Sequence, residues 1–251
     1  LFTSKQIKNF FLKNNKITII KENLVDKISK IKSKKKSSFY SIDKSIAGES
    51  HHKKVSRVSS FLKRNKYDYL FITAPENVAW LLNIRGYDSP TSPIPNSNLL
   101  LTKEKQVFLI VEKNKTTKLL SEKKLKQNQI IDPKYILDFF DKLKKGTILI
   151  DEKTCSLYFE KVIEKKLKIK KKEDPIYILK SIKNNIEIKN MINAHVIDGV
   201  ALTKFIYWIK NLKKMNITEV DAQNKLEQIR RMNSKYLFPS FNTIAGSGKN
   251  G

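Results

Sequence analysis

Cysteine and histidine are scarce in this sequence of 251 residues, which has one Cys and three His. The single Cys155 excludes a disulfide within the chain. One cysteine and three histidines are also too few for a zinc site of the usual Cys/His kind. A lone thiol is compatible with a reducing compartment, so we expect the protein in the cytoplasm.

Long apolar runs are absent too. No stretch of about 18 apolar residues occurs, and the most apolar helical stretch, 196–212, is interrupted by Asp198, Lys204 and Lys210. We therefore expect no transmembrane helix and no membrane partner. No secretory leader pattern follows Leu1, and we expect that the natural start of the protein is missing.

Arginine is rare in a chain whose net charge is +27, since five of its 51 basic residues are Arg. Arginine is the residue best suited to nucleic acids, because its planar guanidinium group makes paired hydrogen bonds to phosphates and to the edges of bases. The abundant Lys, together with Asn and Ile, is typical of a compositional bias spread over solvated faces. We expect no specific nucleic-acid partner.

Strand and helix patterns alternate between residues 51 and 173. Residues 51–65 predict a helix that has Val55, Val58 and Leu62 on one face. Apolar runs predict strands at 67–73, 98–102, 106–111 and 146–151. Helical patterns occur at 78–82, 132–143 and 154–166. Strands that alternate with helices in this way indicate one α/β domain.

The pattern changes at residue 174. Residues 174–185, "DPIYILKSIKNN", predict a short extended segment opened by Pro175. Asn184 and Glu187 are spaced as a capping box, which predicts the start of a long helix that continues to Trp208.

A second helix follows, and then a segment rich in β-formers. Thr218 and Asp221 predict another capped helix start, and we expect that helix to end near Asn233. Residues 236–246, "YLFPSFNTIAG", predict a strand. The small residues of 245–251, "AGSGKNG", allow a tight turn that can approach a ligand closely.

Neighbouring carboxylates and histidines are candidate metal ligands. The carboxylate pairs are Asp138 with Asp141, Asp151 with Glu152, and Glu219 with Asp221. None has a histidine beside it, and we interpret them as solvated faces or helix caps. We interpret His51 and His52, which should point in different directions, as a solvated helix start, and His195 as a packed helix residue.

Three stretches together resemble the Xaa-Pro aminopeptidases, pita-bread metallopeptidases of family M24 with creatinase-like N-terminal domains. They are "PENVAWLLNIRGYDSP" (75–90) followed by "NSNLLLT", residues 182–209, and "ITEVDAQNKLEQIRRM" (217–232) leading to "SFNTIAGSGKNG". In addition, "ENLVDKI" (22–28) is similar to the end of the family's first domain, and "AGES" (47–50) to the start of its second. The resemblance extends over nearly the whole chain.

The resemblance implies an α/β fold class. A creatinase-like mixed-sheet α/β domain should be followed by the N-terminal helices and first strand of a pita-bread α+β domain. The expected division is a remnant of a first creatinase-like domain at 1–28, a linker at 29–50, a second creatinase-like domain at 51–173, and the truncated start of the catalytic domain at 174–251.

The resemblance also implies an activity, namely removal of the N-terminal residue from peptides that have proline second. The family uses two divalent metal ions, usually manganese, that share a bridging hydroxide. Their ligands are two Asp, one His and two Glu, and these match no position in this sequence. We therefore expect a fragment without metal ligands or catalytic residues, and a homodimer for the full-length enzyme.

Four residues match positions near the substrate in the family. Phe241 matches an aromatic residue that borders the metal cavity, and Asn250 lies in the turn before a substrate-contacting histidine that is absent here. Arg85 and Asp88 match a loop that leans toward the active-site mouth. For Arg85 the alternative is an ion pair with Asp88 or Glu76.

Two further interpretations stay open. The chain resembles other pita-bread hydrolases as well, such as an Xaa-Pro dipeptidase or a creatine hydrolase. A noncatalytic pita-bread protein that binds peptides or histones would also suit the basic charge. The metal ligands separate these classes, because a binding protein can lose them and a peptidase cannot.

Overall fold

The computed structural model describes residues 2–11, 20, 24–28, 38–213 and 217–251. These residues form two compact units. The first unit comprises the described residues up to 43 together with residues 49–88 and 94–182, and the second comprises residues 44–48 and 89–93 together with the described residues from 183 to 251. Parts of the expected first-domain remnant and of the expected linker lie outside the described residues. The expected domain boundaries stay predictions.

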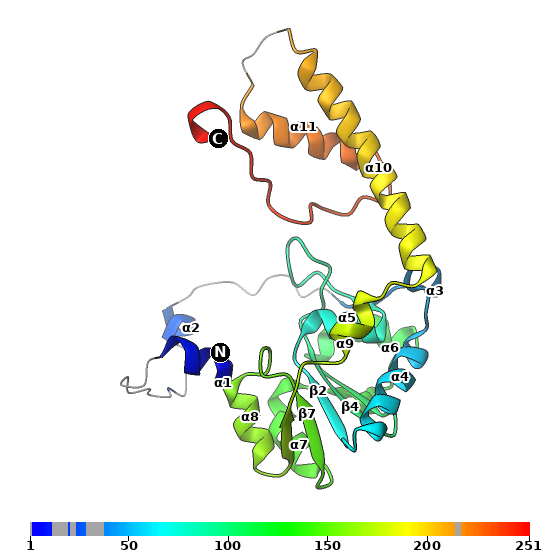
Figure 1. Cartoon of the computed structure of the whole chain (residues 1–251), viewed down its shortest axis with the longest axis vertical. Coiled ribbons are helices and arrows are strands. Elements are labelled where there is room, and N and C mark those ends of the chain that lie inside the picture. The colour runs from blue at the N-terminus through cyan, green and yellow to red at the C-terminus, as the bar shows by residue number, and fades with distance from the viewer. Residues whose placement is uncertain (1, 12–19, 21–23, 29–37, 214–216) are drawn as a thin grey trace. The chain divides into compact units, whose positions relative to one another are not determined.

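A six-stranded mixed sheet forms the centre of the first unit, in the order β6-β5-β4-β2-β7-β8 (Figure 1). Its strands are β2 (Tyr69–Ile72), β4 (Asn98–Thr102), β5 (Val107–Ile110), β6 (Ile130–Ile131), β7 (Thr147–Ile150) and β8 (Lys168–Lys171). β4 is antiparallel to β2 and to β5, and the other neighbours are parallel. The four strands expected from apolar runs are thereby confirmed.

Helices cover both faces of this sheet. Successive strand residues point to opposite sides, and both sides of the central strands carry buried apolar side chains. In β2, Leu70 and Ile72 belong to one buried cluster, whereas Tyr69 and Phe71 belong to the other. The first cluster includes residues of α4 (His51–Arg64), α5 (Pro75–Leu82), α6 (Thr117–Ser121) and α9 (Ile176–Ser181). The second includes residues of α7 (Ile136–Lys142) and α8 (Leu157–Glu164). The unit is therefore a sheet between two helical layers.

Smaller elements complete the first unit. They are α1 (Ser4–Phe10), α2 (Leu24–Ile28), and the two-stranded pair of β1 (Tyr40–Ser41) with β3 (Ile84–Arg85). Single 3-10 turns occur at Lys113–Lys115, Gln127–Gln129 and Pro133–Tyr135. The backbone of Phe2 accepts a hydrogen bond from the Leu157 amide, which holds the start of α1 beside α8.

The segment 174–185, expected to be extended, was predicted wrongly, because it contains helix α9. Pro175 precedes the first helical residue, and Asp174 Oδ1 accepts a hydrogen bond from the Ile176 amide at 2.9 Å. A proline and an acceptor side chain at this place suit a helix start, where the first amides have no partner within the helix.

Helices α10 (Asn185–Lys210) and α11 (Glu219–Arg231) dominate the second unit, together with α3 (Lys44–Ala47). Both predicted capping boxes are confirmed, at Asn184 with Glu187 and at Thr218 with Asp221. The two long helices contact each other, and Arg230 Nε donates to Asp198 Oδ1 at 2.7 Å between them.

The expected first strand of the pita-bread domain, 236–246, is not formed. A strand needs a neighbouring strand for its amide and carbonyl groups, and none pairs with this segment among the described residues. Three of its apolar side chains are exposed, those of Leu237, Phe241 and Ile244, with Ile244 at 93%. The α/β fold class with a mixed sheet is otherwise confirmed.

Candidate functional site

The loop of residues 85–88, expected at an active-site mouth, starts on β3. Asp88 is held firmly there: its Oδ1 accepts from Lys115 Nζ at 2.7 Å, and its Oδ2 accepts from the Asn96 amide at 2.8 Å. The side chains of Asp88 and Lys115 are 15% and 16% exposed. This carboxylate therefore fixes the loop and has little capacity left for a ligand.

Arg85 is bound to backbone carbonyls. Its Nη1 donates to the oxygens of Ile84 at 2.9 Å and Ala79 at 3.2 Å. The two carboxylates that were the alternative partners bind other groups: Asp88 pairs with Lys115, and Glu76 accepts from Tyr177. The guanidinium carries five donors in a planar fork, a geometry that suits carboxylate and carbonyl groups.

Glycine is required inside this loop. A Cβ atom on Gly86 would lie 2.9 Å from Cδ1 of Phe39 and 3.0 Å from the backbone Cα of Pro95. Next to it, the ring of Tyr87 stacks on Tyr40 at a centroid distance of 5.3 Å. The loop is thus packed on the first unit, and Arg85 and Asp88 are positioned together by it.

Phe241 and Asn250 belong to the second unit. Phe241 is 67% exposed and lies in the segment without a strand. Asn250 ends a 3-10 turn, Gly248–Asn250, and the preceding Ser247 amide donates to Glu219 Oε1 at 3.0 Å. Their proposed contact with substrate stays a prediction.

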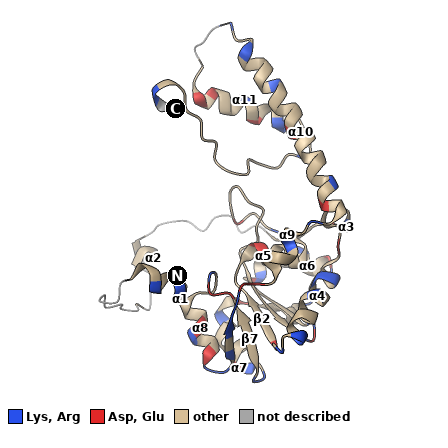
Figure 2. Cartoon of the chain, viewed as in Figure 1, with Lys and Arg blue, Asp and Glu red and all other residues tan. Residues whose placement is uncertain are grey.

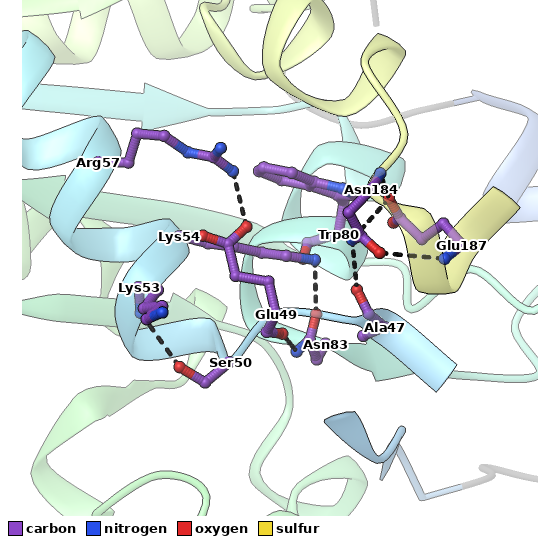
Figure 3. Close-up of polar contacts among 10 residues, drawn as sticks. All are labelled: Ala47, Glu49, Ser50, Lys53, Lys54, Arg57, Trp80, Asn83, Asn184 and Glu187. Atoms are coloured by element: carbon purple, nitrogen blue, oxygen red, sulfur yellow. Dashed lines mark hydrogen bonds and ion pairs between the residues drawn. The ribbon is translucent and has the colours of Figure 1, made fainter. Parts of the chain in front are cut away.

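A buried lysine that the sequence did not indicate lies between α4 and α5. Lys54 is 1% exposed, and its Nζ donates to Asn83 Oδ1 at 2.8 Å and to the Trp80 carbonyl at 3.1 Å (Figure 3). The same nitrogen lies 4.2 Å from the centroid of the Trp80 ring. Asn83 adopts a left-handed conformation at the end of α5 and donates to the Glu49 carbonyl. A cation suits this helix end, where carbonyls lack partners.

Two buried carboxylates, Asp151 and Asp174, lie at the carboxyl end of β7, and each is 3% exposed. The Asp174 amide donates to Asp151 Oδ2 at 3.0 Å, and Asn77 Nδ2 donates to Asp174 Oδ2 at 2.7 Å. Burial raises the pKa of Asp174 to about 6, and the nearby Asp151 charge adds to this rise. The interpretation of Asp151 as a solvated residue was therefore wrong.

The surroundings of Asp174 are polar and hydrogen-bonded. Lys180 Nζ donates to Asn77 Oδ1 at 2.6 Å, and the Tyr177 hydroxyl donates to Glu76 Oε1 at 2.9 Å. Burial, followed by this bond to Glu76, raises the pKa of Tyr177. These hydrogen bonds join α5, α9 and the end of β7. Their carboxylate and amide oxygens accept hydrogen bonds from neighbouring residues, and we interpret the network as structural.

The histidines do not form a metal site within the described residues. The rings of His51 and His52 lie 3.8 Å apart instead of diverging. Burial, with the charge of Lys124 and the neighbouring His52, lowers the pKa of His51 to about 4. In the described parts of the chain, no three His, Cys, Asp or Glu side chains gather as a metal would require. The residues present therefore do not fit a dinuclear metal centre.

Basic residues are distributed over many elements of the chain (Figure 2). Strand β8, at one edge of the sheet, carries Lys168, Lys170 and Lys171. Lysines on an edge strand discourage pairing with other chains. None of the described helices is both long and apolar enough to cross a membrane.

Comparison with known proteins shows related sequences. The protein named "Probable Xaa-Pro aminopeptidase P" of Aspergillus niger is 30% identical over 219 residues, which is 82% of this chain and 35% of the relative. "Xaa-Pro aminopeptidase 1" of Dictyostelium discoideum is 29% identical over 243 residues, covering 92% of this chain and 38% of the relative. The chain thus spans little more than a third of these relatives.

Solved structures share the fold. The X-prolyl aminopeptidase of Caenorhabditis elegans matches with a TM-score of 0.76 and 23% identity, over 90% of this chain and 38% of that chain. The Xaa-Pro dipeptidase of Bacillus anthracis matches with a TM-score of 0.55 and 15% identity, over 72% of this chain and 49% of that chain. At these identities the likeness concerns the fold.

A family match completes the comparison. Residues 8–187 match the family described as the creatinase/prolidase N-terminal domain. This range contains the whole six-stranded sheet and the helices on both of its faces. The resemblance found in the sequence is confirmed, and the chain belongs to the creatinase/prolidase N-terminal domain family.

Proposed function

We propose that this chain is part of an Xaa-Pro aminopeptidase, a hydrolase that releases the N-terminal residue from peptides with proline in second position. The observation that carries this proposal is the 30% identity to the Aspergillus niger protein of that name, over 82% of this chain. Because the chain spans 35% of that relative, the activity is proposed for a polypeptide that contains the chain.

The proposed enzyme uses two divalent metal ions, manganese by our expectation. The related Caenorhabditis elegans enzyme is described as having a di-nuclear active site. Two metals polarise the scissile carbonyl and supply a hydroxide nucleophile. The described residues do not fit such a centre, and we place its ligands outside these 251 residues.

The chain itself contributes residues around the substrate. We propose that Arg85 offers donors to a peptide carbonyl or carboxylate, and that Asp88 positions it by fixing their shared loop through Lys115. We propose that Phe241 borders the cavity with its exposed ring and that Asn250 lies in a turn that approaches the peptide.

The remaining features of the proposed enzyme are its location and partners. We propose a cytoplasmic enzyme, as the Caenorhabditis elegans relative is described as cytosolic. We also propose a homodimer in the complete protein, with no specific nucleic acid as partner. The spread of the basic residues along the chain supports the last point (Figure 2).

The coding sequence around this chain in its source genome tests the proposal. Where the gene continues beyond codon 251, we expect two Asp, then a His and two Glu, in the order that the family uses. Apolar residues at all five positions would contradict the enzyme and favour a noncatalytic peptide-binding protein. Metal ligands tolerate little substitution, so the two outcomes are distinct.

A further inference from the structure

Residues 44–48 lie against the start of α10. The residues that are joined there are 137 to 145 positions apart in sequence, and residue 49 already belongs to the other unit. Asn184 Nδ2 donates to the Ala47 carbonyl at 3.0 Å (Figure 3). Nearly two helical turns further along, Asn190 Nδ2 donates to the carbonyls of Ser45 at 3.2 Å and Ile46 at 3.3 Å. Two asparagines of α10 and its cap thus bind three successive carbonyls of one short segment.

Gly48 makes this approach possible. Its φ is +70°, a conformation that favours glycine, and a Cβ atom at this position would lie 2.0 Å from Asn184 Oδ1. The Cγ atom of Asn184 would be 2.5 Å away. A side chain at residue 48 would therefore be strained at this φ and would displace the segment or the Asn184 side chain, and either movement breaks the contact between them.

Asn184 uses both ends of its amide. Its Oδ1 accepts from the amides of Ile186 and Glu187 at 3.0 Å, which caps α10. Its Nδ2 binds Ala47 and also Glu187 Oε2 at 2.9 Å. Aspartate would supply the cap alone, because an ionised carboxylate has no donor for the Ala47 carbonyl.

We propose that residues 44–48 form a strap that clamps the first turns of α10, so that release of the strap loosens the start of that helix. Residues 44–48 lie within the expected linker, 29–50, and belong to the second unit. This inference does not depend on the proposed peptidase activity, since it concerns contacts within the chain.

Hydrogen exchange of the 251-residue chain, followed by mass spectrometry, tests the strap. The variant Asn190→Ala removes two bonds to the strap while giving α10 a residue with better helix propensity. The matched control is Asn193→Ala, which makes the same substitution, with the same gain in propensity, at another exposed position of α10. We expect Asn190→Ala to speed exchange in peptides covering 44–50 and 184–192 by about fivefold, the size of a lost ordinary hydrogen bond.

In the control variant, hydrogen exchange in both peptides should be unchanged or slower. If hydrogen exchange in residues 184–192 is also unchanged or slower in Asn190→Ala, the strap does not stabilise the helix and the proposal is wrong. A second variant, Gly48→Ala, displaces the strap by a steric clash and should speed exchange in the same two peptides. Gly199→Ala is its control, because a Cβ atom there meets nothing within 4 Å. Equal exchange in the two glycine variants would likewise overturn the proposal.

Discussion

Lys54 and Asn83 are joined by a buried hydrogen bond of 2.8 Å, from the lysine Nζ to the amide Oδ1. Asn83 has a positive φ of 52°, and it ends α5. The lysine of α4 therefore supplies the donor that completes the end of the next helix. The contact ties together two helices that cover the same face of the sheet.

Replacing Lys54 should destabilise the first unit. Lys54→Met keeps the length of the side chain but leaves Asn83 Oδ1 and the Trp80 carbonyl without this donor. We expect a loss of about 1 to 3 kcal/mol in the free energy of unfolding, measured in urea. The control Lys53→Met, at the exposed neighbouring position, should change it by less than about 0.5 kcal/mol. Equal effects of the two variants would show that the buried bonds contribute nothing.

The stability of the first unit should depend on Asp174 in a particular pH range. Its folded pKa of about 6 lies above the usual value of an unfolded Asp, near 3.9. The folded state therefore holds a proton that the unfolded state lacks between these values. The stabilisation from this proton is complete below about pH 4 and is lost as pH rises through 6.

Comparison of wild type with Asp174→Asn isolates this effect. The stability of wild type relative to the variant should rise by about 2 kcal/mol between pH 7.5 and pH 4.5, in unfolding experiments with urea. The exposed Asp138→Asn serves as control and should show no such rise. A wild-type advantage that stays constant or shrinks toward low pH would contradict the account of Asp174.

The half-buried ion pair of Asp88 with Lys115 should contribute more than an exposed pair. A double-mutant cycle with Asp88→Asn and Lys115→Met should give a coupling energy of about 1 to 2 kcal/mol, since both side chains are largely shielded from water. Lys153 with Glu173 is the comparison, with side chains 58% and 50% exposed. That cycle should give at most about 0.5 kcal/mol. A coupling at Asp88 no larger than this would mean that the loop is held by other contacts.

Manganese should not bind tightly to the 251-residue chain. The described residues bring no three suitable ligands together, and divalent metals need several charged or imidazole ligands in one place. Titration calorimetry should therefore show no saturable heat at micromolar metal. A stoichiometric isotherm in that range would place the metal ligands within this chain.

Much of the fold could be predicted because its signals are local. Asn184 and Glu187 stand three residues apart and bind each other and the first amides of α10, so nothing distant is needed. The central strands were predictable because uninterrupted apolar runs indicate strands that are buried on both faces. The helix α9 was missed although Pro175 after Asp174 is a helix-start signal, since the short segment also suits an extended chain.

Burial of polar groups could not be predicted, because it depends on distant partners. Lys54 binds Asn83, 29 residues away, and Asn77 binds Asp174, 97 residues away. For the candidate site, the sequence placed Arg85 and Asp88 on one loop but gave no sign of the partner of Asp88. The strand expected at 236–246 failed for a related reason, since pairing requires a second strand.

We propose that this chain is part of a peptidase selective for proline in second position. The most direct measurement is release of the N-terminal residue from two tripeptides that differ only in having Pro or Ala second, by the complete natural polypeptide that contains these 251 residues. We predict release from the proline peptide alone, loss of release with a chelator, and recovery with manganese. Equal release from the proline and alanine peptides would contradict this proposal. So would cleavage of dipeptides alone, or no release at any metal concentration.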